Sequence, residues 1–239
     1  MYNNNMKSIE TIVISLGGSV VVPDSVDTDY IEQFTALLRT YKNKRFYIVV
    51  GGGKTARVYI KAARSRGENE YMLDKIGIFA TRLNASILLT YLRDLAYPNI
   101  PATVDEAAEN VDNYSVIVMG GTEPGHTTDT VSVLLAERLN CKRVINATAV
   151  DGIYDVDPKK DKNAMLLKNI DYKDAVSLTV SEMINAGPNV VLDLLSIKLA
   201  ERSNIEIDVI NGKNLDNFKN CIENRQFYGT VVSNYHLKK

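Results

Sequence analysis

The chain has 239 residues, 45% of them hydrophobic, and a formal net charge of -1 at pH 7. A chain of this length buries a sizeable core, as one large domain or two small ones, without disulfides or metal ions to hold it together. The near-neutral charge is unlike the basic footprint of nucleic-acid-binding proteins, so we expect no nucleic-acid partner.

Cysteines and histidines are few and isolated. Cys141 and Cys221 lie far apart in the sequence, as do His126 and His236. Neither a disulfide framework nor a zinc site is predicted, and no residue is assigned as a metal ligand. The first ten residues are polar where a signal peptide needs an apolar core, and no stretch reaches the length of a membrane span. We therefore expect a cytoplasmic protein with no membrane association.

The first part of the chain contains the same unit twice, a strand followed by a glycine loop. Residues 11–16 form an apolar β-branched run that ends in Gly17, Gly18 and Ser19. An amphipathic pattern from Asp27 to Tyr41 predicts a helix. A second strand over residues 45–50 then runs into three glycines, 51–53, and a basic helix.

A third unit lies in mid-chain, where an apolar run from Val116 breaks into a loop of glycines and threonines that opens a helix. Glycines let the backbone approach a ligand, the threonines offer hydroxyls, and the helix directs its free N–H groups to the same place. An anion is therefore the expected ligand of this loop. The alternative is that the loop is an ordinary strand-to-helix turn, because the same residue types cap helices without binding anything.

The remaining elements alternate along the chain. We predict a long helix with one apolar face over residues 71–95, in which Asp74, Arg82 and Asn84 are typical of solvated or structurally paired side chains. A short helix over 105–110 and a strand over 141–148 follow. The segment after this strand is a hairpin or loop, in which Tyr154 could stack on a base and Asp157 could hold a ribose or cap a turn. Further helices are predicted over 173–183, 190–204 and 214–223, with strands over 205–210 and 229–233.

Eight of the fourteen glycines lie in the three loops, each directly after an apolar run. Strands that alternate with helices favour a mostly parallel sheet, in which loops at the carboxyl ends of strands gather along one edge. Three glycine loops on one edge indicate a polyphosphate ligand.

Simple nucleotide motifs do not account for these loops. The Gly53-Lys54-Thr55 sequence resembles the end of a P-loop, but Ile48 stands where that motif requires glycine. The 51–56 segment satisfies the dinucleotide-binding pattern G-x-G-x-x-A, yet Asp74, at the distance expected for its acidic residue, falls in a helical pattern. Protein-kinase motifs and the G-x-S-x-G serine elbow are missing from the sequence.

Five ordered segments together carry a resemblance that no single motif does: ISLGGS, VVGGGKTAR, LDKIGIFATRLNA, MGGTEPGHTTD and ATAVDGIYDVDPKKD. They resemble the amino acid kinase family and, within it, the archaeal-type uridylate kinases. The similarity extends from about residue 11 to the closing GTVVS. It implies an α/β fold, a three-layer αβα sandwich with a mainly parallel central sheet, as one domain over residues 1–239. It also implies transfer of the γ-phosphoryl group of ATP to UMP, giving UDP and ADP in pyrimidine nucleotide biosynthesis, with Mg²⁺ bound with ATP.

The resemblance also assigns residues. It places the acceptor side at about 11–140 and the ATP side at about 141–239. The residues implied for ATP are Gly18, Ser19, Gly53, Arg57, Thr148, Tyr154 and Asp157. Those implied for UMP are Gly52, Asp74, Thr122, Glu123, Pro124, Gly125, His126, Thr127 and Thr128. Those implied for catalysis are Asp129, Asp193, Arg57 and Lys54, although capping and surface roles stay open for the two aspartates.

One position departs from the pattern of many family members, because Ser15 stands where a lysine often precedes the first glycine loop. Neutralisation of the charge on the transferred phosphoryl group would then fall to Lys54, Arg57 and Mg²⁺.

Alternative functions within the same family are those of an isopentenyl phosphate kinase and an acetylglutamate kinase. A non-catalytic nucleotide-binding regulatory or storage module is a further one. The resemblance and the apolar-faced helix predict a homo-oligomer, a hexamer built from dimers, with UTP as a candidate feedback inhibitor.

Overall fold

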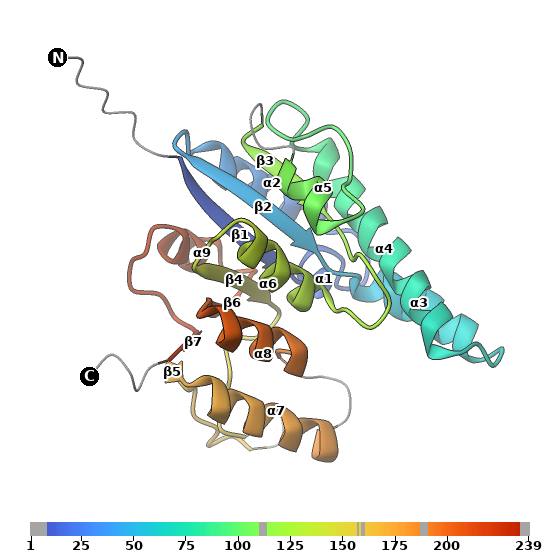
Figure 1. Ribbon diagram of the computed structural model, residues 1–239, viewed down its shortest axis with the longest axis vertical. Helices are drawn as coiled ribbons and strands as arrows, with labels where there is room; N and C mark the ends of the chain where they lie inside the picture. The colour runs from blue at the N-terminus through green and yellow to red at the C-terminus, as the bar shows by residue number, and fades with distance from the viewer. Residues whose placement is uncertain (1–8, 110–113, 157, 159–160, 187–190, 235–239) are drawn as a thin grey trace.

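The computed structural model describes residues 9–109, 114–156, 158, 161–186 and 191–234. Within these ranges seven strands form one sheet in the order β3-β2-β1-β4-β6-β7-β5 (Figure 1). All neighbours run parallel except β6 and β7. The strands are β1 (Glu10–Leu16), β2 (Lys44–Val50), β3 (Val116–Met119), β4 (Arg143–Thr148), β5 (Asn169–Ile170), β6 (Glu206–Asn211) and β7 (Thr230–Val232).

Helices cover both faces of the sheet and complete three layers. Their bounds are α1 (Gly18–Val21), α2 (Thr28–Arg39), α3 (Gly53–Arg64), α4 (Glu70–Thr90), α5 (Val104–Glu109), α6 (Thr128–Arg138), α7 (Tyr172–Ala186), α8 (Leu194–Ser203) and α9 (Leu215–Ile222). One core cluster joins the sheet to α2, α4 and α9, and a second joins the opposite face to α5, α6, α7 and α8. The predicted αβα sandwich with a mainly parallel sheet is confirmed.

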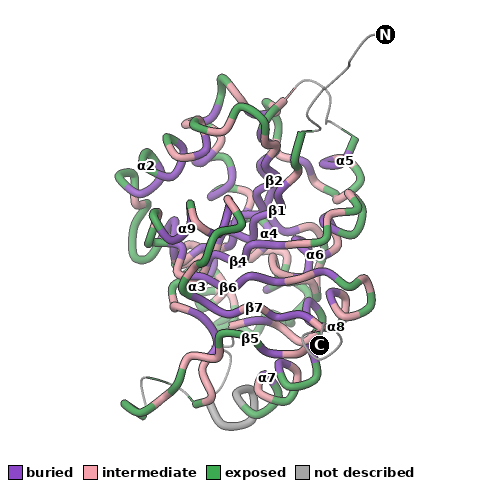
Figure 2. Tube along the Cα trace, turned by 90° about the vertical axis from the view of Figure 1, so that its left-hand side faces the viewer, coloured by how far each residue is buried: buried purple, intermediate pink, exposed green. Residues whose placement is uncertain are grey.

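Alternation along the central strand explains the two cores. In β1, Ile12, Ile14 and Leu16 enter the first cluster, whereas Val13 enters the second, because successive strand residues point to opposite faces. Figure 2 shows the strands buried along their length and the helices exposed on their outer sides. Ser15 alternates with Ile14 and therefore lies on the Val13 side of the sheet, the side that α6 covers.

The structure corrects several details of the predicted elements and confirms one. Two short elements were missed, α1 immediately after the first glycines and the two-residue strand β5. Both are too short to carry a periodic pattern. The helix predicted over 190–204 begins at Leu194, where Asp193 accepts a hydrogen bond from the Ser196 N–H as the N-cap. The segment after β4 is hairpin-like, with Leu167 N–H bonded to the Ile153 carbonyl.

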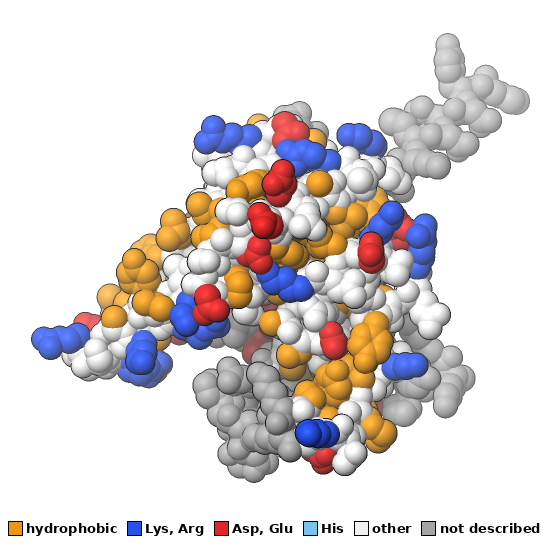
Figure 3. Space-filling view, turned by 180° about the vertical axis from the view of Figure 1, so that it is seen from behind, with side chains coloured by type: hydrophobic (Ala, Val, Ile, Leu, Met, Phe, Trp, Pro, Cys, Tyr) orange, Lys and Arg blue, Asp and Glu red, His pale blue; other side chains and the backbone are white. Residues whose placement is uncertain are grey.

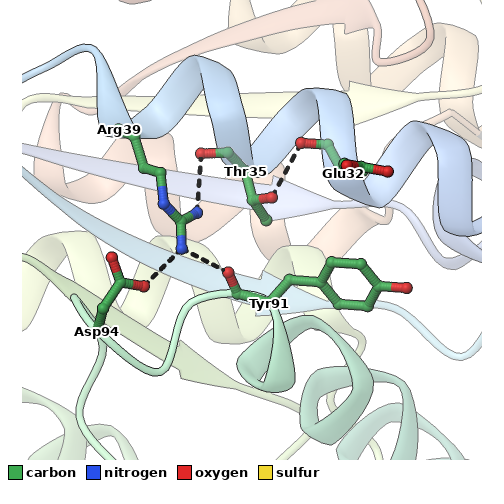
Figure 4. A network of polar contacts seen from close by, with 5 residues as sticks. All are labelled: Glu32, Thr35, Arg39, Tyr91 and Asp94. Carbon is green, nitrogen blue, oxygen red and sulfur yellow. Dashed lines mark hydrogen bonds and ion pairs between the residues drawn. The ribbon is translucent and has the colours of Figure 1, made fainter.

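The long helix α4 ends at Thr90 rather than at residue 95. Figure 4 shows an arginine from α2 that reaches the end of α4. The Arg39 guanidinium donates to the Tyr91 carbonyl at 2.8 Å and pairs with the Asp94 carboxylate. A cation at a helix C-terminus satisfies a free carbonyl and favours the helix dipole there. This tertiary contact therefore stabilises the end of the helix.

Among the described residues, none of the helices has both the length and the apolar character needed to cross a membrane.

Candidate active site

The three glycine loops lie side by side because the strands before them end at the same level. Leu16 pairs with Val50, and Val49 pairs with Met119, so β1, β2 and β3 present their carboxyl ends along one edge. The end of β4 continues this edge, since Leu16 also pairs with Ala147. The loops after β3, β2 and β1 and the β4 residue Thr148 therefore follow one another across the sheet.

The first two loops touch backbone to backbone. A Cβ atom on Gly18 would lie 2.0 Å from the Gly53 nitrogen, and one on Gly53 would lie 2.2 Å from the Gly18 oxygen. Gly53 also has a φ of +54°, in the left-handed region that favours glycine. These two positions require glycine, and they bring the start of α1 against the start of α3.

A cavity of about 280 Å³ lies beside these loops, between α3, α4 and the start of α6. Six of the residues predicted for the acceptor line it, namely Gly52, Asp74, Gly125, His126, Thr127 and Thr128. Thr122, Glu123 and Pro124 belong to the same loop but lie outside this lining. The walls from α3 and α4 are apolar at Ala56, Ile60 and Ile78. This combination of apolar walls and few polar groups is typical of small-molecule sites.

Helix α4 holds the third glycine loop at several points. The Asp74 carboxylate accepts a hydrogen bond from the Gly125 N–H at 2.8 Å. Two turns further on, the Thr81 hydroxyl accepts one from the Gly121 N–H at 2.7 Å. The Arg82 guanidinium donates to the carbonyl of Gly121 at 3.0 Å. The loop is thus fixed by side chains of one helix.

Sequence reasoning did not identify Thr81 and treated Arg82 as a solvated or structurally paired residue. The signal that could have found both is their spacing from Asp74, seven and eight residues. In a helix, residues about two turns apart lie on the same face.

The N-terminus of α6 joins the acceptor loop to α8 through Asp193. One Asp193 oxygen accepts from the Thr127 hydroxyl at 2.5 Å and the other from the Thr130 hydroxyl at 3.0 Å. Thr127 also caps α6, and Asp193 caps α8. Asp193 is therefore an anchor between two helix N-termini in this structure.

Asp129 lies in the first turn of α6 and faces β1. Its carboxylate accepts a hydrogen bond from the Ser15 hydroxyl at 2.7 Å. The residue as a whole is partly buried, but protein encloses its carboxyl group, and this burial raises the pKa of Asp129 to about 6. The Ser15 hydrogen bond lowers that pKa, while the nearby Asp193 carboxylate raises it. Ser15, the departure from the family pattern, thus contacts a predicted catalytic residue directly.

The two predicted catalytic cations lie on α3. The Lys54 ammonium pairs with the Asp24 carboxylate at 3.3 Å, and both side chains are exposed. Arg57 is exposed and forms no ion pair with any described residue. Of the two cations, Arg57 is therefore the one whose charge is not already paired with a carboxylate among the described residues.

Residues predicted for the nucleoside of ATP come from the far side of β1. Thr148 ends β4, and its carbonyl accepts from the Gly212 N–H at 2.8 Å. Tyr154 lies in the hairpin-like segment, where it forms a bridge with Leu166. Ser19, which the resemblance assigns to the phosphates of ATP and not to the nucleoside, lies in α1, half-buried beside Gly18. Asp157 lies outside the described residues.

Comparisons with known proteins agree with this geometry. The model of the amino acid kinase family matches residues 10–211. The uridylate kinase of Thermoplasma volcanium is 49% identical over 223 residues, which is 93% of this chain and 97% of that protein. The uridylate kinase of Methanoculleus marisnigri is 41% identical, over 94% and 96% of the two chains. This chain belongs to the amino acid kinase family.

Solved structures are similar along nearly the whole chain. The crystal structure of uridylate kinase from Archaeoglobus fulgidus has a TM-score of 0.79 and 40% identity, and covers 93% of this chain and 99% of its own. The UMP kinase from Bacillus anthracis has the same TM-score at 22% identity, which is a likeness of fold.

We predict that Ser15→Ala raises the pKa of Asp129 above its value in the unaltered protein, because the hydrogen bond that stabilises the carboxylate is lost. Carbon-13 NMR of the aspartate carboxyl groups between pH 4 and 9 measures this, with Asp129→Asn to assign the signal. Ser132→Ala is the control, since that hydroxyl donates to a carbonyl of its own helix. An unchanged Asp129 titration in Ser15→Ala would contradict the assignment.

Proposed function

We propose that this protein transfers the γ-phosphoryl group of ATP to UMP, giving UDP and ADP. The observation that carries the proposal is the acceptor cavity, in which six residues matched to the family's acceptor motifs converge from three separate segments of the chain. Relatives with this sequence pattern over nearly their whole length are uridylate kinases. Isopentenyl phosphate kinase, acetylglutamate kinase and a non-catalytic module are not favoured.

The order of the loops across the sheet supports an arrangement for the two substrates. UMP would occupy the cavity beside the loops after β2 and β3, and ATP would extend from the loop after β1 toward β4 and β6. The contact between Gly18 and Gly53 lies between these two regions, where the phosphates would meet. This arrangement is consistent with an acceptor side over about 11–140 and an ATP side over about 141–239.

Phosphoryl transfer needs alignment, charge neutralisation and exclusion of water, with little covalent work for the protein. Backbone N–H groups at the starts of α3 and α6 would orient the phosphates. Arg57 would neutralise the phosphoryl group in transit, with Lys54 available once released from Asp24. The phosphate of UMP, with a second pKa of about 6, is already an anionic nucleophile near neutral pH and needs no general base.

Mg²⁺ bound with ATP would add charge neutralisation at the transferred group. Asp129 and Asp193 would supply carboxylate oxygens, the ligand type that Mg²⁺ prefers, from side chains that accept hydrogen bonds from the Ser15, Thr127 and Thr130 hydroxyls in this structure. Feedback inhibition by UTP and a cytoplasmic location stay predictions from the family resemblance.

The acceptor choice tests the function. We expect UMP to be phosphorylated at least tenfold faster than CMP, AMP or isopentenyl phosphate, because a wrong base leaves buried polar groups unpaired at about 1 to 3 kcal/mol each. An assay coupled to ADP release measures the four rates at equal acceptor concentration. Equal rates across the panel would refute UMP as the substrate.

Asp74 and Arg57 provide a crossed test of the residue roles. Asp74→Ala should raise KM for UMP by roughly ten- to a hundredfold and leave KM for ATP nearly unchanged, since a lost charged acceptor costs about 1.5 to 3 kcal/mol. Arg57→Ala should lower kcat and weaken the binding of ATP. Arg57→Lys should restore these only in part, because a lysine cannot form the bidentate hydrogen bonds of a guanidinium. Lys61→Ala, one turn further along α3 and exposed, is the control. A reversed pattern would mean that the roles are assigned wrongly.

We also propose a homo-oligomer that buries the outer face of α3 and α4. These helices project as an arm from the sheet (Figure 1), and hydrophobic side chains gather along the arm (Figure 3). Tyr59 and Phe79 are both 63% exposed, and Leu83 is 55% exposed. A contiguous apolar face of this kind is typical of a subunit interface. A hexamer built from dimers stays the predicted assembly.

We expect Phe79→Asp with Leu83→Asp to reduce the particle mass in multi-angle light scattering at micromolar concentration, because two buried charges would oppose association. Met165→Asp is the control, since Met165 is 66% exposed on the hairpin-like segment. A monomeric unaltered protein, or a mass unchanged by the double substitution, would count against this interface.

A further inference from the structure

Asn84 on α4 is a buried amide whose hydrogen bonds all go to the segment around the second glycine loop. The side chain is 3% exposed. Its Nδ2 group donates to the Gly51 carbonyl at 2.9 Å and to the Gly52 carbonyl at 3.0 Å. Its Oδ1 atom accepts from the Thr55 hydroxyl at 3.2 Å. An amide that faces two carbonyls must present its NH₂ group to them, so the Thr55 hydrogen bond and the loop contacts fix one orientation.

These contacts determine where the loop's N–H groups point. In a trans peptide unit the carbonyl of one residue and the N–H of the next point in opposite directions. When Asn84 holds the carbonyls of Gly51 and Gly52 toward α4, the N–H groups of Gly52 and Gly53 point away from α4. Within the described ranges no protein acceptor takes a hydrogen bond from either group. A bound anion would supply the acceptor that the protein does not.

The loop has no side chain with which to hold itself in this orientation. Glycine is required where the first loop packs against it, because a Cβ atom on Gly51 would lie 2.4 Å from the Gly18 nitrogen. Glycines also have the greatest backbone freedom, so an unanchored run of three would populate many peptide orientations. Main-chain hydrogen bonds hold the two ends of the run, from the Gly51 N–H to the Leu16 carbonyl and from the Ala56 N–H to the Gly52 carbonyl. Asn84 adds the side-chain contact that holds both carbonyls of the run toward α4.

We propose that Asn84 is a positioning residue that orients the Gly52 and Gly53 N–H groups toward the phosphates of the substrates. This inference rests on the proposed function, since it takes those phosphates to be the ligands of the loop. The side chain itself touches no substrate. Its effect is confined to the phosphate part of the binding free energy.

Binding of UMP and of uridine distinguishes this role from a general structural one. We expect Asn84→Ala and Asn84→Asp to weaken UMP binding at least tenfold and to change uridine binding less than twofold, as measured by isothermal calorimetry. The aspartate should have the larger effect, because its carboxylate repels the two carbonyls and the phosphate. Thr55→Val should also weaken UMP binding, but by less, because it only frees the Asn84 amide to rotate.

Thr90→Ala is the matched control, an exposed hydroxyl on the same helix that donates to the Ile87 carbonyl. It should leave both affinities unchanged. Equal weakening of UMP and uridine in the Asn84 variants would overturn the proposal. If neither Asn84 variant folds, Thr55→Val decides the question by the same comparison.

The unaltered protein separates this proposal from the function on which it rests. If it binds UMP no more tightly than uridine, the loop does not hold the phosphate and the proposed site fails, whatever the Asn84 variants do. If it prefers UMP strongly and the Asn84 variants keep that preference, only the role of Asn84 fails.

Discussion

The active edge of this protein depends on the direct contact between two glycine backbones at the ends of β1 and β2. The strands are neighbours in parallel register, so their ends meet at one level, and a side chain on Gly18 would come within 2.0 Å of the next loop. Any larger residue would push the two loops apart. The distance between the two proposed phosphate regions is therefore set by contacts between main-chain atoms, which do not depend on side-chain rotamers.

Helix α4 is the second support of this edge. Its inner face bonds to two of the three loops, through Asn84 to the loop after β2 and through Thr81 and Arg82 to the loop after β3. Asp74, on the same helix, reaches Gly125 at the far end of the acceptor loop. Its outer face carries exposed apolar residues. In the proposed assembly, one helix would hold the acceptor loop with its inner face and meet another subunit with its outer face.

A third connection runs through carboxylates at the starts of helices. Asp193 joins α6 to α8 by hydrogen bonds from Thr127 and Thr130, and it caps α8 as well. Two helix N-termini meet there, and each favours negative charge. Asp129, in the first turn of α6, is not stabilised by Asp193, because burial and the Asp193 carboxylate both raise the pKa of Asp129, to about 6, while the Ser15 hydrogen bond opposes them. The carboxylate that joins the two helices therefore also favours the protonated form of Asp129.

The periodic pattern of the sequence determined the strands, most helices and the gathering of the glycine loops, because these depend on local alternation of apolar residues and on parallel register. Family motifs then indicated the acceptor loop. The contact of Arg39 with the end of α4 does not follow from that pattern, because this arginine lies more than fifty residues away and only folding brings it to the helix. The roles of Thr81 and Asn84 were likewise decided by tertiary structure. A buried hydroxyl or amide has no periodicity of its own, and its partners, the carbonyl and N–H groups of distant glycines, are identical at every position of a sequence.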